Sequence, residues 1–260
     1  MNTEDAKLAA DWIWRAWIEE RRIDSIPEAI RPKNRAEGYE VQRQLADLSG
    51  QSTLGWKIAA TSQAGQAHLR VDGPLAGRLL ADRVCLDGAS IRLGNNGMRV
   101  AEAEFAFRLR HDLPARQEPY DLAEVVEAIH TLQPAIEVPD SRYRDFCVVG
   151  DAQLIADDAC AFQLVLGKPV NDWRRLDLAA HVVQVQLNGR PIRDGRGANV
   201  LGDPRLAMHW IANELRVHGP GLKSGDIVTT GTTIVPIAIE PGSRVLADFG
   251  CLGTVTTVLV

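Results

Sequence analysis

The sequence predicts an α+β protein, in which a short helical region precedes a longer region rich in strands. Two segments near the N-terminus have the apolar spacing of amphipathic helices, and β-branched residues dominate much of the remainder. The strands do not alternate regularly with long helices, so a Rossmann-type sheet is a poor interpretation. We expect a helical N-terminal region over residues 1–52 and a β-rich domain over residues 53–260, with its strands in a barrel, roll or sandwich.

The first elements follow from local patterns. Residues 5–22 and 34–48 are the two expected helices, and the proline-marked segment SIPEAIRP connects them. TLGWKIAAT is the first expected strand, and SQAGQAHLRV is expected to form a short helix. Three more segments read as strands separated by turns: VCLDGASIRL, MRVAEAEFAFRLR and PAIEVPDS. Before the last of these, DLAEVVEAIHTL is predicted to be a helix with Asp121 as its N-cap.

The later elements have clearer boundaries. CAFQLVLG, HVVQVQLNG and RPIRDG are expected strands, and Asn188-Gly189 predicts a tight hairpin turn between the last two. DPRLAMHWIANELRVHG predicts a helix that Asp203 caps and Gly219 ends. The rest of the chain, from Asp226 onward, is predicted to be β throughout.

Composition excludes several classes of protein. The formal net charge is -5 and no Lys/Arg block occurs, so nucleic-acid binding has no electrostatic support. No apolar run is long enough to span a membrane, and the acidic N-terminus lacks the apolar core of a signal peptide. The four scattered cysteines favour reduced thiols over disulfides or a zinc site. We therefore expect a cytoplasmic protein without nucleic-acid or membrane partners.

Two glutamates on one predicted strand are the most unusual local feature. In the segment RVAEAEFAF, Glu102 and Glu104 share one face of the strand, and the opposite face is wholly apolar. Two adjacent carboxylates on a buried strand repel each other and are costly to desolvate, and a divalent cation removes both costs. An all-oxygen site suits Mg²⁺, Mn²⁺ or Ca²⁺. A solvated edge strand is the competing interpretation.

Two further residues strengthen the metal hypothesis. Glu137 lies between Ile136 and Val138 on another apolar strand, where a third carboxylate ligand would explain it. Lys57 follows Gly55 in the apolar segment GWKIAAT. It could bind a substrate carboxylate or, if desolvated, transfer protons, and a surface lysine that reaches solvent is the alternative.

Seven segments, in order, resemble the motifs of one enzyme family: GWKIAATS, VDGPLAGRLL, VAEAEFAF, LQPAIEVPDSRYRDF, IADDACAF, GANVLGDP and GDIVTTGT. This is the 2-keto-4-pentenoate hydratase / 4-oxalocrotonate decarboxylase family, within the fumarylacetoacetate hydrolase-like superfamily. The resemblance runs from about Tyr39 to the C-terminus. It implies a mixed β-sandwich or roll core, a small helical N-terminal region and a homo-oligomer of two or more subunits.

The resemblance also implies a site and its chemistry. Mg²⁺ or Mn²⁺ would be ligated by Glu102, Glu104 and Glu137, with Lys57 as a catalytic residue. The expected substrate-binding residues are Arg78, in VDGPLAGRLL, with Thr230 and Gly231, in GDIVTTGT. The substrate would be a small 2-keto or 2-hydroxydienoic acid that reacts through a metal-stabilised enolate.

Departures from the family pattern leave the reaction open. Leu75 stands where many hydratases carry an acid, while decarboxylases tend to have an apolar residue there. Asp158 and Cys160 replace the amide and hydroxyl of the family's DNAS motif. We expect a hydratase first and a 4-oxalocrotonate-type decarboxylase second. A C–C bond hydrolase is less favoured because His68 has no acid beside it, and a non-catalytic partner subunit is the remaining hypothesis.

Overall fold

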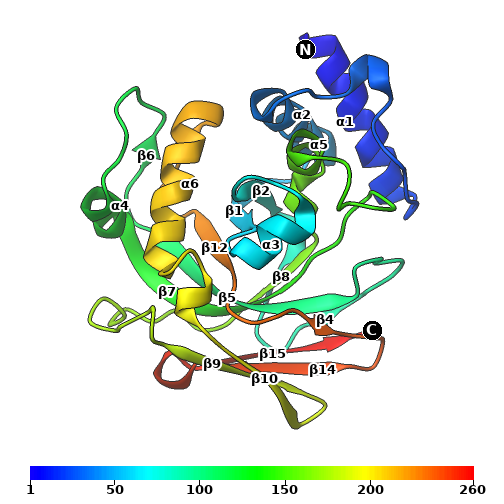
Figure 1. Ribbon diagram of the computed structural model, residues 1–260. Coiled ribbons are helices and arrows are strands. Elements are labelled where there is room, and N and C mark those ends of the chain that lie inside the picture. The colour runs from blue at the N-terminus through cyan, green and yellow to red at the C-terminus, as the bar shows by residue number, and fades with distance from the viewer.

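Two β-sheets stacked face to face organise the chain in the computed structural model, which describes residues 1–260 (Figure 1). The larger sheet has eight strands in the order β2-β1-β12-β5-β7-β8-β3, with β13 beside β5. Its strands are β1 (Thr53–Ala59), β2 (Leu75–Leu80), β3 (Val84–Leu86), β5 (Val100–Leu109), β7 (Ile129–Val138), β8 (Gln163–Leu166), β12 (Ile227–Thr232) and β13 (Ile237–Ala238). The pairing is mixed, because β1 runs parallel to β12 and β3 runs parallel to β8.

The smaller sheet has five strands in the order β10-β9-β14-β15-β4. Its strands are β4 (Ser90–Ile91), β9 (Val182–Leu187), β10 (Arg190–Arg196), β14 (Arg244–Asp248) and β15 (Thr254–Leu259). The hairpin between β9 and β10 turns at Asn188 and Gly189, which both have positive φ, as predicted from this pair. A separate two-stranded ladder joins β6 (Leu113–Pro114) and β11 (Gly221–Leu222).

The helices lie on the face of the large sheet that is opposite the small sheet (Figure 1). They are α1 (Thr3–Ile18), α2 (Arg35–Ser49), α3 (Gln63–Leu69), α4 (Leu122–Ala128), α5 (Asp151–Ala156) and α6 (Pro204–His218). Short 3-10 turns occur at Glu28–Ile30, Ala81–Arg83, Asp158–Cys160, Gly197–Asn199 and Gly250–Leu252. No helix is long and apolar enough to cross a membrane.

The alternation of residues along β5 builds the core between the sheets. Ala101, Ala103 and Phe105 are fully buried, and the ring of Phe105 packs edge-on against Phe249 at 5.2 Å between centroids. The opposite face of the strand carries Glu102 and Glu104, which therefore point toward the helices. The structure thus confirms the predicted strand, which has one apolar face and one face that carries the two glutamates.

One local prediction was wrong, and one strand was missed. The segment DLAEVVEAIHTL is helical only to Ala128, and Ile129 starts β7, whose Ile129 pairs with Leu109 of β5. The β-branched residues Ile129 and Thr131 suit a strand, and sheet pairing overrides the helical spacing there. Strand β2 was not predicted, because LAGRLL has no alternation and is buried on both faces beside β1.

The N-terminal helices pack on the rest of the chain. Helices α1 and α2 form a second buried cluster with Leu80, Tyr143 and Ala156, which belong to later segments. The backbone of Ile23 also exchanges hydrogen bonds with Arg142 and Arg144. Strand β1 begins at Thr53, next to the boundary expected from sequence, and the division into two regions stays a prediction.

Candidate metal centre

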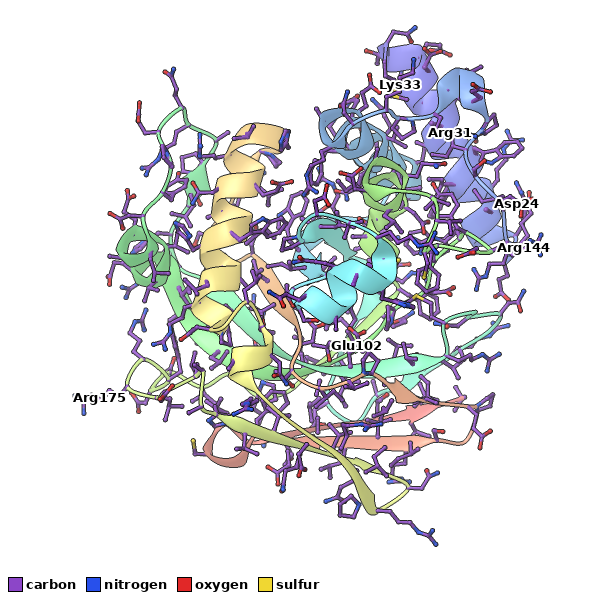
Figure 2. All side chains as sticks on the ribbon, viewed as in Figure 1. Asp24, Arg31, Lys33, Glu102, Arg144 and Arg175 are labelled. Carbon is purple, nitrogen blue, oxygen red and sulfur yellow. The ribbon has the colours of Figure 1, made fainter.

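Sheet register brings the three predicted glutamates together. Glu102 of β5 pairs directly with Glu137 of β7, and Glu104 lies two residues farther along β5 on the same face. One carboxylate oxygen from each residue lies within 4.8 Å of those of the other two. Glu104 and Glu137 are 0% and 1% exposed, whereas Glu102 is half-buried and faces a cavity. In Figure 2, Glu102 lies near the centre of the molecule, below α3.

The hydrogen bonds of the three carboxylates leave room for a cation. The backbone N–H of Gly231 donates to Glu104 Oε2 at 2.9 Å, whereas Glu104 Oε1 is buried without a partner. Glu137 Oε2 is likewise buried without a partner. Buried carboxylate oxygens with no donor are costly, and a divalent cation that prefers oxygen ligands would satisfy both. The three residues therefore fit Mg²⁺ or Mn²⁺.

Burial and mutual repulsion raise the pKa values of Glu102 and Glu104. Burial, followed by the charge of Glu137, raises the pKa of Glu102 to about 7. The same two causes, in the same order, hold the pKa of Glu104 well above its usual value. Both shifts express the cost of gathering three negative charges away from water, and a cation offsets that cost.

Lys57 joins the cluster from across the sheet. Its Nζ lies 3.2 Å from Glu137 Oε1 and donates to the carbonyl of Ala159 at 3.0 Å. Strands β12 and β5 separate β1 from β7, so the two side chains can meet only because the sheet curls. Burial lowers the pKa of Lys57, but Glu137, Glu102 and Glu104 outweigh burial and raise this pKa above its usual value. Lys57 is thus a buried ammonium, and a surface lysine is excluded.

The carbonyl that Lys57 contacts belongs to an unusual turn. Asp158, Ala159 and Cys160 are consecutive residues with φ of 54°, 47° and 63°, in the left-handed region that L-residues disfavour. Asp158 accepts a 2.6 Å hydrogen bond from the backbone N–H of Arg78 on β2. A side chain at Gly77 would clash with the Asp158 carbonyl, so glycine permits this close approach. Strand β2 therefore helps to hold the turn that receives Lys57.

A buried ion pair between Arg142 and Asp157 lies directly before the turn at Asp158–Cys160 and stabilises it. Asp157 accepts hydrogen bonds from the side chain and backbone of Arg142 and from the hydroxyl of Ser141. The Arg142 guanidinium lies over the ring of Trp17, 4.0 Å from its centroid. Helix α1, which carries Trp17, thus contacts the residues that fix the turn.

A cavity of about 490 Å³ opens beside the glutamates. Among its 23 lining residues are Lys57, Glu102, Cys160 and Gly231, and helix α3 forms one wall with His68 and Leu69. Burial raises the pKa of the Cys160 thiol to about 12, so this group stays protonated near neutral pH. The cavity is large enough for a small organic acid and reaches the three-carboxylate cluster at Glu102.

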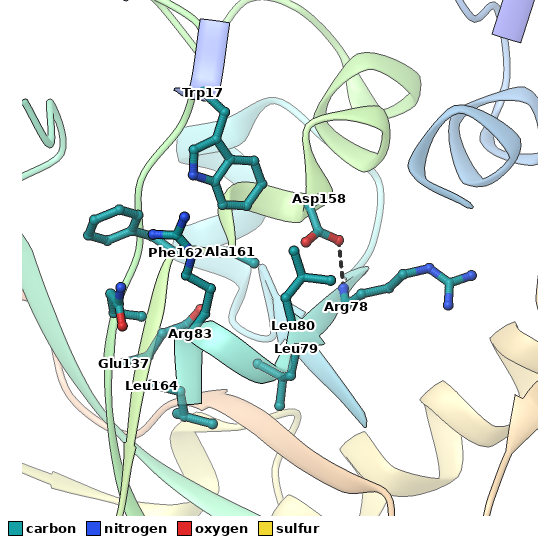
Figure 3. A pocket seen from close by; sticks show the side chains of 11 residues that line it. Trp17, Arg78, Leu79, Leu80, Arg83, Glu137, Asp158, Ala161, Phe162 and Leu164 are labelled. Carbon is teal, nitrogen blue, oxygen red and sulfur yellow. Dashed lines mark hydrogen bonds between the residues drawn. The ribbon is translucent and has the colours of Figure 1, made fainter. Parts of the chain in front are cut away.

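Two predicted substrate-binding residues do not line this cavity. The Arg78 guanidinium lies over the ring of Trp56, 4.5 Å from its centroid, and points away from Glu137 (Figure 3). The Thr230 hydroxyl is buried and donates to the carbonyl of Phe105. Gly231 does line the cavity, where its N–H contacts Glu104. Of the three residues, the structure brings only Gly231 together with the glutamates.

A second, much smaller pocket lies behind Glu137. It is lined by Trp17, Arg78, Arg83, Asp158 and Glu137, among others (Figure 3). Its volume of about 10 Å³ is near the minimum that one water molecule requires. Of these two pockets, only the large cavity has room for an organic molecule beside the glutamates.

Sequence reasoning did not identify most of the cavity wall. Thr61, Met98, Phe146 and Val235 line it from four separate segments. No local pattern marks these residues, because they become neighbours only through the packing of loops at one end of the sheet. His68 was noted without an acidic partner, and in the structure its Nε2 lies 3.4 Å from the Cys147 sulfur.

Comparison with known proteins extends these observations. Residues 80–260 match the family described as fumarylacetoacetate (FAA) hydrolase C-terminal. A 2-keto-4-pentenoate hydratase from Burkholderia vietnamiensis is 33% identical over 216 residues, which cover 83% of this chain and 81% of that protein. A 2-hydroxyhexa-2,4-dienoate hydratase from Comamonas testosteroni is 35% identical over 205 residues, which cover 77% of this chain and 76% of that protein.

A solved structure resembles the whole chain. The 4-oxalocrotonate decarboxylase from Pseudomonas putida G7, complexed with magnesium and adipate, superposes with a TM-score of 0.90 at 25% identity. The superposition covers 100% of this chain and 99% of the decarboxylase. It confirms the predicted fold class, including the helical N-terminal region.

Proposed function

Since the chain belongs to the fumarylacetoacetate hydrolase family, we propose that it is a metal-dependent lyase acting on a small 2-keto or 2-hydroxydienoic acid. The observation that carries the proposal is the buried cluster of Glu102, Glu104 and Glu137 beside a cavity of about 490 Å³. The names of the similar hydratases and of the decarboxylase support this substrate class.

The three glutamates would hold Mg²⁺ or Mn²⁺. Their unpartnered buried oxygens support this assignment, and so does the magnesium of the similar decarboxylase structure. When bound, such a cation supplies Lewis acidity that stabilises the enolate of a 2-keto acid. Glu104 would be oriented for this task by the Gly231 N–H, and Glu137 by the Lys57 ammonium.

Lys57 would act as a fixed positive charge at the inner end of the cavity. Its contacts with Glu137 and the Ala159 carbonyl account for two of the three N–H donors of an ammonium. The third would be available to a carboxylate or keto oxygen of the substrate. A preorganised cation of this kind favours a reacting molecule in which negative charge develops on oxygen.

Hydration is the first choice of reaction, because the two relatives described above, at 33% and 35% identity, are hydratases. In this reaction 2-hydroxypenta-2,4-dienoate takes up one water. C5 gains a proton and C4 a hydroxyl, while the enol at C2 becomes a ketone as its proton is lost and C3 gains a proton. The product is 4-hydroxy-2-oxopentanoate. Water would enter through the large cavity, which reaches Glu102 and Lys57.

Decarboxylation is the second candidate, and Leu75 favours it. Leu75 is fully buried at the start of β2, so no acid stands at this position of the fold. The likeness of the whole chain to a 4-oxalocrotonate decarboxylase points the same way. That reaction would release CO₂ from 4-oxalocrotonate and leave 2-hydroxypenta-2,4-dienoate.

One assay separates the two reactions. The purified chain would be incubated with Mg²⁺ and either 2-hydroxypenta-2,4-dienoate or 4-oxalocrotonate, and the products identified by ultraviolet absorbance and mass. We expect the mass of one water to be gained from the first substrate. Loss of CO₂ from the second would establish decarboxylation instead, and no turnover of either would support a non-catalytic partner subunit.

A binding experiment tests the metal centre separately. Glu104→Gln should weaken Mg²⁺ binding by at least about tenfold in calorimetry, because a buried ligand loses its charge. Glu118→Gln removes the same charge from an exposed loop and should leave the affinity unchanged. Undiminished affinity in the Glu104 variant would show that the metal assignment is wrong.

We also propose that the protein is a homo-oligomer. Leu8, Trp12 and Ile18 of α1 are exposed apolar side chains, and a subunit interface would cover them. Sedimentation of the purified chain at several concentrations gives the number of subunits.

A further inference from the structure

Six threonines are buried in the structure, and their hydroxyl groups differ in what they contact. Three of them donate to backbone carbonyls: Thr230, Thr233 and Thr257. The hydroxyls of Thr131 and Thr229 are enclosed by the protein without a hydrogen-bond partner. The sixth is Thr61, which is 4% exposed and whose hydroxyl makes no hydrogen bond within the protein. It is the only one of the six that lines the large cavity.

The hydroxyl of Thr61 lies beside the candidate metal centre. Thr61 comes after the end of β1 and after Ala60, whose φ of 58° is left-handed. The backbone carbonyl of Thr61 accepts a 2.9 Å hydrogen bond from the N–H of Leu201, which fixes this segment. The hydroxyl oxygen lies 2.0 Å from the position that a Cβ on Gly231 would occupy, so it lies directly against this glycine. The N–H of Gly231 in turn donates to Glu104.

From these contacts, and resting on the proposed function, we infer that Thr61 is a substrate-binding residue. Its hydroxyl donates a hydrogen bond to an oxygen of the 2-keto acid head group, which is the carboxylate and the adjacent keto group. Lys57 and Glu102 line the same cavity, so this is the end of the cavity at which the charged head group would bind. The single O–H of a threonine is a donor, and no acceptor of the protein takes it here. A carboxylate or keto oxygen of the substrate supplies that acceptor.

Packing alone does not account for a threonine at this position. A hydroxyl that is removed from water without a partner costs free energy, whereas valine has nearly the same shape without this cost. A threonine with a purely structural role would donate to the protein, as Thr230 does to the carbonyl of Phe105. The cost at Thr61 is recovered only when a ligand in the cavity accepts the hydrogen bond.

Calorimetry with unreactive 2-keto acids tests the inference without turnover. The Mg²⁺-loaded protein would be titrated with 2-oxopentanoate and with pyruvate, which has the same head group and only a methyl tail. Thr61→Val should weaken the binding of both acids at least about tenfold, because a hydrogen bond to a charged oxygen is lost. Thr61→Ser keeps the hydroxyl, so it should bind both acids within about fourfold of the unaltered protein, the effect of one methyl group.

Thr131→Val is the matched control. Thr131 also has an unpartnered hydroxyl, but it does not line the cavity, so this variant should leave the affinity for both acids unchanged. Neither valine variant should lower the free energy of unfolding in urea, because neither hydroxyl bonds to the protein. The affinity of Thr61→Val for Mg²⁺ alone should equal that of the unaltered protein. Loss of acid binding with stability and metal binding kept is the signature of a substrate contact.

The outcomes separate the inference from the proposed function. If Thr61→Val binds both acids as tightly as Thr131→Val does, the inference is overturned and the metal-dependent function stands. Weaker binding of Mg²⁺ alone, or a marked loss of stability, in Thr61→Val also overturns it, because the hydroxyl then acts on the protein itself. A loss with 2-oxopentanoate but not with pyruvate would place the contact outside the head group and likewise contradict it. If neither acid binds the unaltered Mg²⁺-loaded protein, the proposed function fails and the inference falls with it.

Discussion

Lys57 is a buried charge that contacts the three-glutamate cluster and also lines the large cavity. The ammonium compensates part of the negative charge of three glutamates, and Glu137 is its direct partner at 3.2 Å. At the same time it lines the cavity that would hold the substrate. Without a cation among them, the carboxylates outweigh burial and raise the pKa of Lys57. A role of Lys57 in proton transfer stays a prediction.

Replacing Lys57 should separate turnover from metal binding. Lys57→Met is expected to lower kcat/KM at least about a hundredfold, because the positive charge at the inner end of the cavity is lost. Mg²⁺ affinity should be kept or increased, since a competing cation has left the carboxylates. Steady-state kinetics and calorimetry give the two values, with Lys168→Met on the surface as the control. Full activity in Lys57→Met would remove this residue from the mechanism.

The adjacent acids Asp157 and Asp158 should respond to amide substitution in opposite ways. Burial raises the pKa of Asp158 to about 6 from 3.8, so the folded state binds its proton more tightly than the unfolded state. Stability from this group is therefore present below about pH 4 and lost as the pH rises toward 6. Asp158→Asn keeps an acceptor for the Arg78 N–H and should raise the free energy of unfolding at pH 7.5 by about 2 kcal/mol.

Urea unfolding at pH 4.5 and 7.5 measures this effect. The gain of Asp158→Asn should shrink at the lower pH, where the native carboxyl is protonated. Asp157→Asn is the contrast. Burial also raises the pKa of Asp157, but removing its charge leaves the fully buried Arg142 guanidinium without a counter-charge, which should cost about 3–5 kcal/mol. A destabilised Asp158→Asn at pH 7.5 would contradict the prediction.

Among single residues, the clustering of the three glutamates was more predictable than the orientation of Arg78. Glu102, Glu104 and Glu137 interrupt apolar strands, and strand periodicity places the first two on one face. Arg78 also lies on a strand, but the face it occupies depends on the pairing of β2 with β1, where Arg78 is opposite Trp56 and Gly77 is opposite Lys57. Pairing between strands has no local signal, so the orientation of Arg78 was not available from sequence.

At the scale of elements, the end of β12 is shaped by one glycine. Gly231 has a φ of +92°, and an added Cβ would lie 2.0 Å from the Thr61 hydroxyl. The register of β12 with β5 is interrupted between Thr229 and Thr232, and this irregularity turns the Gly231 N–H toward Glu104. Gly231 therefore allows the irregular end of β12 to place a backbone N–H against Glu104 in the candidate metal centre.

Gly231→Ala should disturb both stability and metal binding. The clash with Thr61 is expected to displace the segment, with a loss of about 2 kcal/mol or more in stability and a weaker Mg²⁺ site. Gly253→Ala is a matched control, because Gly253 has a φ of +93° but no atom within 4 Å of the added Cβ. Denaturant unfolding and calorimetry of both variants provide the comparison. Equal Mg²⁺ affinity in the two would show that the Gly231 N–H does not orient Glu104.

Elements with clear end signals were predicted with accurate bounds, whereas the boundary between α4 and β7 and the strand β2, which depend on pairing, were not. Helix α6 begins after Asp203 and ends before Gly219, as capping chemistry indicates. The boundary between α4 and β7 at Ile129 was missed, because the helical spacing continues into residues whose state the neighbouring strand β5 decides. Sheet pairing is a long-range interaction, which a single sequence does not display.

At the scale of the whole molecule, we expect the three clustered glutamates to make stability depend on a divalent cation. In the metal-free protein, the pKa of Glu102 rises from 4.5 to about 7, chiefly through burial, so stability should fall as the pH rises through this range. Saturating Mg²⁺ should reverse the loss, because it binds the ionised folded state. At about a hundred times the dissociation constant, we expect the Tm to rise by roughly 5–10 °C at pH 8.

Differential scanning calorimetry with EDTA or Mg²⁺ at pH 5 and pH 8 measures this dependence. The Mg²⁺-induced increase in Tm should be smaller at pH 5, where protons compete with the cation. Glu104→Gln should show little Mg²⁺ effect at either pH. A Tm that is insensitive to Mg²⁺ at pH 8 would contradict a metal site at these residues.

The pairing of Glu102 with Glu137 suggests a way to measure how much of a preparation is correctly folded. A slip of one residue between β5 and β7 would send one of these carboxylates to the opposite face of the sheet, away from its two partners. Only molecules with the correct strand alignment would then present a complete set of ligands. The stoichiometry of a metal titration would consequently count the correctly folded fraction of a refolded or evolved preparation, even when no substrate is at hand.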